Sequence, residues 1–219
     1  MIILLILLFH RLGTGHSEKT TRELTSGNPV EMNADAVNWE LRKHNGDVFI
    51  YQRWVEAESG RKARELYAEI LSASSPEQLA LVIREEKNGT EWLSMADEYR
   101  ILEQPSDSVW FAYSKFNFTP ALRFDLVTRN ALKSNPSTGS VTIGINGKPD
   151  YLPEQSKFRR LSHFEGRWEF IPAGNHLTQI RYYMFSKTKP FLPRWITYPF
   201  VLNELENCMT TVRNIAEKP

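Results

Sequence analysis

The chain ends in one amphipathic helix that follows a long series of β-rich runs, and this order restricts the possible folds. Apolar side chains of the last segment recur at helical spacing: Val201, Leu205, Cys208, Met209, Val212, Ile215 and Ala216. Turn residues separate the preceding runs, which are Tyr99–Gln104, Val109–Phe118, Phe124–Lys133, Ser140–Ile145, Phe158–Ile171 and Leu177–Lys187. A sheet must bury one face, so we predict an α+β fold in which a curved antiparallel sheet is covered by the C-terminal helix.

The earlier part of the chain adds a hairpin and a short helix to this plan. Trp39–His44 and Val48–Trp54 flank an Asn-Gly turn, which is a strong hairpin signal. Ser75 before Pro76 predicts the start of a short helix. The segment Arg61–Leu71 fits either a third strand or a helix, because its apolar residues have helical spacing beside a predicted hairpin.

Composition excludes several classes of protein. The chain of 219 residues has 27 Lys and Arg against 26 Asp and Glu, a net charge of +1, so no nucleic-acid partner that depends on bulk positive charge is expected. An apolar fraction of 41% supports a single domain with its own core, which we place at residues 34–219. Cys208 is the single cysteine, so neither an intramolecular disulfide nor a Cys-rich zinc site can form.

The N-terminus has the features of an export signal. Residues 2–9 are all apolar, and small polar residues follow, but eight residues are too few to span a bilayer as a helix. We interpret residues 1–17 as a signal-like segment and residues 18–33 as a linker, which predicts an exported, periplasmic or secreted protein. The alternatives are a disordered N-terminus or a start codon assigned too far downstream, which would leave the protein in the cytoplasm.

Alternation along the predicted strands indicates which side chains face inward. In the run from Phe158 to Phe170 the even positions carry most aromatic residues, and Ile180, Tyr182 and Met184 share a face of the next strand. Arg160 falls on this aromatic face, where an unpaired charge is costly, so it needs a carboxylate, a water-filled cavity or a ligand. Asp125 is the candidate partner, and the alternative is an arginine that extends to the rim.

Several short motifs, in order, resemble the StAR-related lipid-transfer (START) domain of the Bet v 1-like helix-grip superfamily. They span about 175 residues: Trp39-Glu-Leu, Gly46-Asp-Val-Phe-Ile-Tyr51, Pro120-Ala-Leu-Arg-Phe-Asp125, Phe158-Arg-Arg160, Gly166-Arg-Trp168, Pro172 and Leu192-Pro-Arg-Trp195. The chain departs from the family pattern at Phe124, at Lys187–Pro190 and at Tyr198.

The resemblance implies a sheet wrapped around the C-terminal helix and a tunnel for one hydrophobic ligand, such as a lipid or a sterol-like compound. It also implies that Arg160 and Asp125 form the polar spot of that tunnel. Together with the inward faces, this gives a predicted lining of Arg160, Asp125, Phe164, Trp168, Phe170, Ile180, Tyr182, Met184, Trp195, Val201, Leu205 and Met209. The same aromatic pattern would also fit a filled core.

No catalytic or metal motif is present, so we expect neither a cofactor nor a metal. The five histidines are scattered and form no metal-ligand pair, and the phosphate-binding glycine motifs are absent. Lys187 and Lys189, beside an apolar Phe-Leu pair, are suited to transient contact with a membrane surface. Two alternatives to a ligand carrier stay open: an enzyme of the cyclase or hydratase type using Arg160, Asp125 and Tyr182, and a structural module with a filled pocket.

Overall fold

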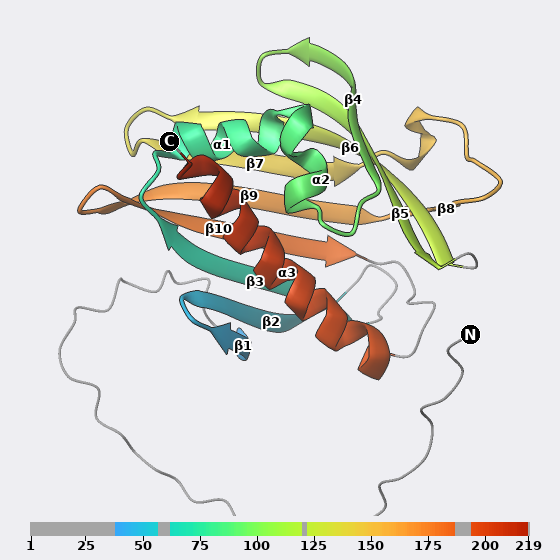
Figure 1. Cartoon of the computed structure of the whole chain (residues 1–219), viewed down its shortest axis with the longest axis horizontal. Coiled ribbons are helices and arrows are strands. Elements are labelled where there is room, and N and C mark those ends of the chain that lie inside the picture. Colours follow the sequence, from blue (N-terminus) through green and yellow to red (C-terminus); the bar gives the residue numbers. More distant parts are fainter. Residues whose placement is uncertain (1–37, 57–61, 120–121, 187–193, 219) are drawn as a thin grey trace, which may run out of the picture. The chain divides into compact units, whose positions relative to one another are not determined.

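The computed structural model describes residues 38–56, 62–119, 122–186 and 194–218. The described residues form a ten-stranded sheet in the order β1-β2-β3-β10-β9-β7-β6-β5-β4, with β8 beside β6 (Figure 1). The strands are β1 (Glu40–Asn45), β2 (Val48–Glu56), β3 (Lys62–Ser72), β4 (Glu98–Ser106), β5 (Val109–Thr119), β6 (Leu122–Asn135), β7 (Ser140–Gly147), β8 (Arg159–Arg160), β9 (Phe164–Gly174) and β10 (Leu177–Ser186). The helices are α1 (Pro76–Arg84), α2 (Gly89–Trp92) and α3 (Arg194–Ala216), with short 3-10 turns η2 (Glu86–Asn88) and η3 (Pro149–Tyr151).

The predicted signal-like segment 1–17 and linker 18–33 lie outside the described residues, as do Lys187 and Lys189. No helix in the part of the chain that the structure describes is long and apolar enough to cross a membrane.

Local sequence signals placed the hairpin and the first helix correctly. β1 and β2 pair across a turn of Gly46 and Asp47, where Gly46 has a φ of +59° that favours glycine. At the start of α1, the Ser75 side chain accepts from the Gln78 backbone N–H, and the Gln78 side chain accepts from the Ser75 backbone N–H. This reciprocal capping box fixes where the helix begins.

The segment that fitted either a strand or a helix is the strand β3. It pairs with β2 on one side and with β10 on the other, so it lies in the middle of the sheet. Leu66, Ala68 and Ile70 are buried at alternate positions. Pairing with β10, more than 100 residues further along the chain, overrides the helical spacing of its apolar residues.

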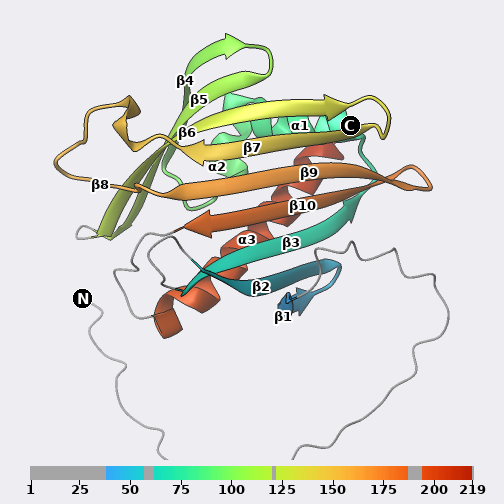
Figure 2. The ribbon, with the colours of Figure 1, turned by 180° about the vertical axis from the view of Figure 1, so that it is seen from behind.

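All helices that contact the sheet lie on the same face of it, which we call the inner face. α3 contacts β2 and β3, and α1 contacts β7 and β9. Figure 1 shows α1 and α3 in front of the sheet, whereas Figure 2, from behind, shows the opposite, outer face. The predicted α+β arrangement, an antiparallel sheet covered by the C-terminal helix, is confirmed.

The apolar stripe of α3 is also confirmed. Leu205, Cys208, Met209 and Val212 are buried in the core, and Val201, Ile215 and Ala216 pack against it. The helix begins at Arg194, before the first residue of the predicted stripe, Val201. Pro199 therefore lies inside the helix, where its missing N–H removes one backbone hydrogen bond.

Polar side chains fasten α3 along its length. Lys43 of β1 pairs with Glu206, Ser94 donates to Glu204, and Arg213 pairs with Asp47. At the far end Glu217 accepts from the Ser72 hydroxyl and from the Ala73 backbone N–H, both at 2.8 Å.

Cys208 offers a direct test of the packing beneath α3. Burial raises the pKa of the Cys208 thiol, and the thiolate is the form that reacts with alkylating agents. We expect iodoacetamide to modify the folded protein at least about 100-fold more slowly than the unfolded protein at the same pH. Intact-mass spectrometry measures both rates, and similar rates would contradict the packing.

The predicted run from Phe158 to Ile171 is wrong as a single strand. The structure contains two strands, because residues 161–163 break the ladder between β8 and β9. β8 pairs in parallel with the start of β6, whereas β9 lies between β7 and β10. The two parts consequently belong to different regions of the sheet.

β4 forms one edge of the sheet and is irregular. Its register with β5 shifts between Ile101 and Glu103 and again between Glu103 and Ser106. Pro105 lies in this irregular part and carries no backbone N–H.

Candidate ligand-binding face

The register of the strands shows which side chains share the inner face. One row across the sheet comprises Gln52, Leu66, Met184, Gly166, Ile145 and Asn130. The neighbouring row contains Ile50, Ala68, Tyr182, Trp168, Ile143 and Leu132.

The predicted lining residues in the second row and beyond it form a packed core. The ring of Trp168 stacks on Tyr182 at 4.1 Å and on Phe170 at 6.0 Å, and it meets Trp92 of α2 edge to face at 6.0 Å. Trp168, Phe170 and Ile180 have no exposed surface. Leu205 and Met209 of α3 belong to the same cluster.

Three other predicted lining residues are half-buried on the inner face. Phe164 and Met184 come from β9 and β10, and Val201 comes from α3. These side chains pack against the core cluster without being enclosed by it. The side chain of Trp195 lies outside the described part of the chain, although its backbone belongs to α3.

A polar group that the sequence prediction missed lies between β2 and α3. Gln52 is completely buried on the inner face, and its Oε1 accepts a hydrogen bond from the Tyr198 hydroxyl of α3. Its Nε2 has no partner among the described residues. The alternation of Val48, Ile50 and Gln52 was a usable signal, because it places a polar side chain on an apolar face.

Arg64 of β3 lies next to this group and was also missed. Its guanidinium carbon is 4.7 Å from the ring centre of Trp54 and 4.5 Å from that of Tyr198. Its Nε is buried without a hydrogen-bond partner in the described residues. Burial raises the pKa of Tyr198 and opposes the effect of nearby Arg42 and Arg64, so the phenol stays protonated and able to donate.

The predicted partnership of Arg160 with Asp125 is confirmed. Arg160 Nε lies 2.9 Å from Asp125 Oδ1, and Nη2 lies 3.0 Å from Oδ2, in a bidentate pair. The side chains are 2% and 0% exposed. This hydrogen bonding raises the pKa of the Arg160 guanidinium, whereas burial, followed by the Asp125 charge, raises the pKa of Tyr113 to about 12.

This ion pair lies on the outer face, so its predicted place on the inner aromatic face is wrong. Leu132 pairs with Ile143 of the core, so even-numbered residues of β6 face inward and Asp125 faces outward. Arg160 meets Asp125 through the parallel pairing of β8 with β6. Alternation counted from β9 assigned Arg160 to the inner face, but the break at residues 161–163 interrupts that alternation.

The segment between β7 and β8 covers the ion pair. Arg160 donates to the backbone carbonyls of Pro149, Leu152 and Pro153. Tyr113 donates to Asp125 at 3.3 Å and accepts from Gln155 at 3.0 Å. Backbone carbonyls and a tyrosine thus satisfy the pair within the protein.

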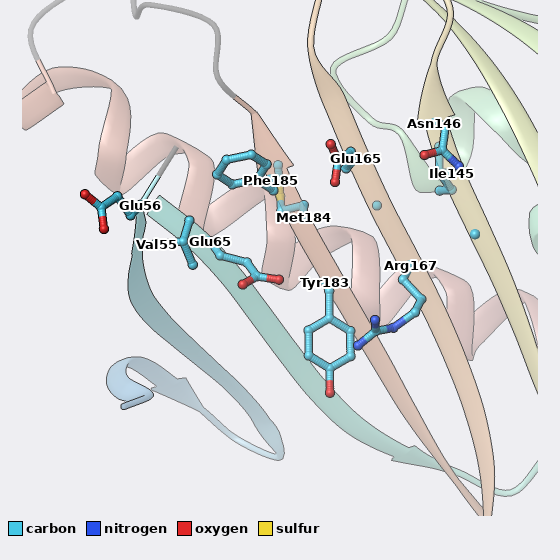
Figure 3. Close-up of a pocket in the computed structure, with 12 residues that line it drawn as sticks. Val55, Glu56, Glu65, Ile145, Asn146, Glu165, Arg167, Tyr183, Met184 and Phe185 are labelled. Atoms are coloured by element: carbon cyan, nitrogen blue, oxygen red, sulfur yellow. The ribbon is translucent and has the colours of Figure 1, made fainter. Parts of the chain in front are cut away.

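A shallow groove of about 400 Å³ lies elsewhere on the outer face (Figure 3). Tyr183 and Arg167 form part of its wall, with the guanidinium carbon 4.3 Å from the ring centre. Gly144 contributes no side chain to this surface, and a Cβ added there would meet nothing closer than a backbone oxygen at 4.0 Å.

No group of three or more His, Cys, Asp or Glu side chains that could hold a metal occurs within the described ranges. In the described strands, the inner-facing positions of β3, β6, β7, β9 and β10 carry neither Asp nor Glu. On these strands the inner face therefore offers aromatic and aliphatic surface with a few hydrogen-bond donors, whereas β1 and β2, at one edge of the sheet, carry Glu40 and Glu56 at inner-facing positions.

The chain resembles one curated protein in sequence and several solved structures in fold. No family model matches the chain. The uncharacterized protein PA1579 of Pseudomonas aeruginosa is 24% identical over 193 residues, which cover 86% of this chain and 92% of that protein.

Several solved structures have a similar fold. A STAR-related lipid transfer protein from Xanthomonas axonopodis has a TM-score of 0.73 at 20% identity and covers 83% of this chain and 99% of its own. Human StAR-related lipid transfer protein 5 has a TM-score of 0.66 at 12% identity, with 84% and 88% covered. The Zhui aromatase/cyclase from Streptomyces sp. R1128 has a TM-score of 0.51 at 12% identity, with 70% and 93% covered. The expected resemblance in fold is confirmed.

Proposed function

From the START helix-grip fold that the chain shares with these structures, we propose that the protein binds a hydrophobic small molecule between the inner face and α3, without catalysing a reaction on it. The observation that carries this proposal is the half-buried apolar surface of Phe164, Met184 and Val201, which packs against the core cluster. Small-molecule sites generally combine such apolar walls with a few polar groups that orient the ligand. Two of the resembling structures are named as lipid transfer proteins, which supports a lipid or sterol-like ligand.

The structure separates the three residues that a cyclase or hydratase was expected to use. Asp125 and Arg160 lie on the outer face, whereas Tyr182 lies on the inner face in the core. A general acid or base must reach the same substrate atoms as its partners, so these three side chains cannot form one site.

We also propose that the protein acts outside the cytoplasm and touches a membrane surface transiently when it exchanges its ligand. Export is supported by the apolar run of residues 2–9, and membrane contact by Lys187 and Lys189 beside an apolar pair. Edman sequencing of protein from the host's extracellular fractions tests export, and an uncleaved cytoplasmic protein would contradict it.

Native mass spectrometry of protein purified from its host, followed by lipid extraction, is the primary test. We expect one hydrophobic molecule per chain, released when the protein unfolds. Protein that carries no such molecule and also fails to bind the neutral dye Nile red would overturn the proposal.

A matched pair of variants tests which face of the sheet holds the ligand. Val201→Phe fills space beside the inner face from α3, and Gly144→Leu fills the outer groove at a position with an ordinary backbone conformation. Met184 is not used for this pair, because it also lines the groove. We expect Val201→Phe to weaken Nile red binding about tenfold, because the larger side chain competes for the same apolar space, and Gly144→Leu to leave it unchanged.

Fluorescence titration measures both affinities, and thermal unfolding confirms that each variant is folded. If Val201→Phe does not fold, Phe164→Trp on β9 provides the same inner-face test. Loss of binding in Gly144→Leu alone would place the ligand in the outer groove instead.

A further inference from the structure

We propose that the ligand's polar end is an anion, a carboxylate or a phosphate, held by Arg64 and Gln52 where β2 and β3 meet α3. This inference rests on the proposed function and specifies the class of amphiphile that the inner face accepts.

Arg64 is a cation without a counter-ion among the described residues. It is half-buried on the inner face and forms no ion pair among the described residues. Its register places Glu56 two positions along the neighbouring strand, yet the two side chains do not pair. By contrast, neighbouring Arg42 pairs with Glu40 at 2.6 Å. A half-buried guanidinium whose buried Nε lacks an acceptor among the described residues favours an anionic partner.

Two aromatic rings hold Arg64 in place. The rings of Trp54 and Tyr198 both lie within 4.7 Å of its guanidinium carbon. Stacking on the ring faces leaves the in-plane N–H groups as the donors that remain for a ligand. The cation is therefore positioned before a ligand binds, which lowers the entropic cost of recognition.

Gln52 supplies a second donor on the same face. Tyr198 contacts both groups, because its ring stacks on Arg64 and its hydroxyl donates to Gln52 Oε1. This hydrogen bond occupies the oxygen of the amide and leaves Nε2 as a buried donor without a partner. A buried donor left unpaired is costly, and an acceptor atom of the ligand would remove that cost.

The remaining unpaired buried groups of the inner face have the same polarity. The indole N–H groups of Trp92, Trp110 and Trp168 are donors and have no hydrogen-bond acceptor among the described residues. Unpaired donors on this face, the cation Arg64 and the absence of an inner-facing carboxylate on the described central strands select against a ligand with an ammonium group.

The experiment compares amphiphiles that share one chain and differ at the head. Displacement of Nile red by oleate, methyl oleate, oleylamine and 1-oleoyl lysophosphatidate is measured below their aggregation concentrations. We expect oleate or the lysophosphatidate to bind at least about tenfold more tightly than methyl oleate, and oleylamine to bind most weakly. The better of the two anions identifies whether the head is a carboxylate or a phosphate.

Variants assign this preference to the two side chains. Arg64→Met should reduce the preference for the anion over the ester to less than about twofold, Arg64→Lys should keep part of it, and Gln52→Leu should reduce it several-fold. Arg181→Met is the matched control, because Arg181 also has a buried, unpaired Nε but lies on the outer face of β10. It should leave the preference intact.

Equal binding of oleate, the lysophosphatidate and methyl oleate to the unmodified protein would overturn the anion site while leaving the hydrophobic binder in place. Tighter binding of oleylamine would overturn it as well. A protein that binds neither Nile red nor any of the four amphiphiles would refute the proposed function itself.

Discussion

Replacing Arg160 by Met is expected to lower the free energy of unfolding by about 3–5 kcal/mol while leaving ligand binding intact. The substitution leaves the Asp125 carboxylate completely buried, with the Tyr113 hydroxyl as its remaining side-chain partner. It also removes the donor to three backbone carbonyls of the covering segment. Since a folded domain is stable by about 5–15 kcal/mol, the loss is a large part of the total.

Urea denaturation measures the change, and Nile red titration of the folded variant measures binding. The double variant Arg160→Met/Asp125→Leu is the control, because replacing both charges by apolar side chains avoids an unpaired buried carboxylate. It should recover more than half of the lost stability. Lost binding with unchanged stability in Arg160→Met would instead mean that the arginine contacts the ligand.

Replacing Trp168 by Ala is the second substitution with a large expected effect, a loss of about 3–5 kcal/mol in the free energy of unfolding. The indole has no exposed surface and contacts rings from β9, β10 and α2. Removing it leaves a void that these neighbours cannot fill without moving, and the stacking energy is lost too.

Phe164→Ala is the matched comparison, since Phe164 comes from the same strand and faces the same side but is half-buried. We expect it to cost less than about 2 kcal/mol and to weaken Nile red binding at least as much as Trp168→Ala does in the folded state. Urea denaturation measures the loss of stability in Phe164→Ala and in Trp168→Ala. A loss below about 1 kcal/mol for Trp168→Ala would mean that the indole lines an open cavity rather than the core.

The elements that the sequence predicted well are those defined by neighbouring residues. Gly46 follows Asn45 in a tight turn, and Ser75 caps α1 through Gln78 three residues later. The apolar stripe of α3 is equally local, because its period is visible within a single segment. The order and the type of these elements could therefore be predicted without knowing which segments pack together.

The errors arose where partners distant in sequence decide the structure. β3 becomes a strand because β2 and β10 flank it, and β8 is separated from β9 because it pairs with β6. Alternation predicts that side chains on one strand share a face, but it cannot detect a break within an apparently continuous run.

In the candidate site, one contact was predicted correctly, whereas its face on the sheet and one further residue were not. The pairing of Arg160 with Asp125 was predicted from the cost of an unpaired charge, which is independent of which face is involved. The predicted face of this ion pair was wrong, because β8, which carries Arg160, is separated from β9 and pairs with β6. Arg64 was missed because the segment 61–71 had no assigned face while it fitted both a strand and a helix.

The irregular edge at β4 has a consequence for how the protein behaves at high concentration. A regular exposed strand is a template on which a second copy can add a strand and start aggregation. Two register shifts and the missing N–H of Pro105 interrupt the ladder of backbone groups that such an addition would need. Crowded solutions should thus produce little β-sheet polymer through this edge, even though the domain is built almost entirely from one large sheet.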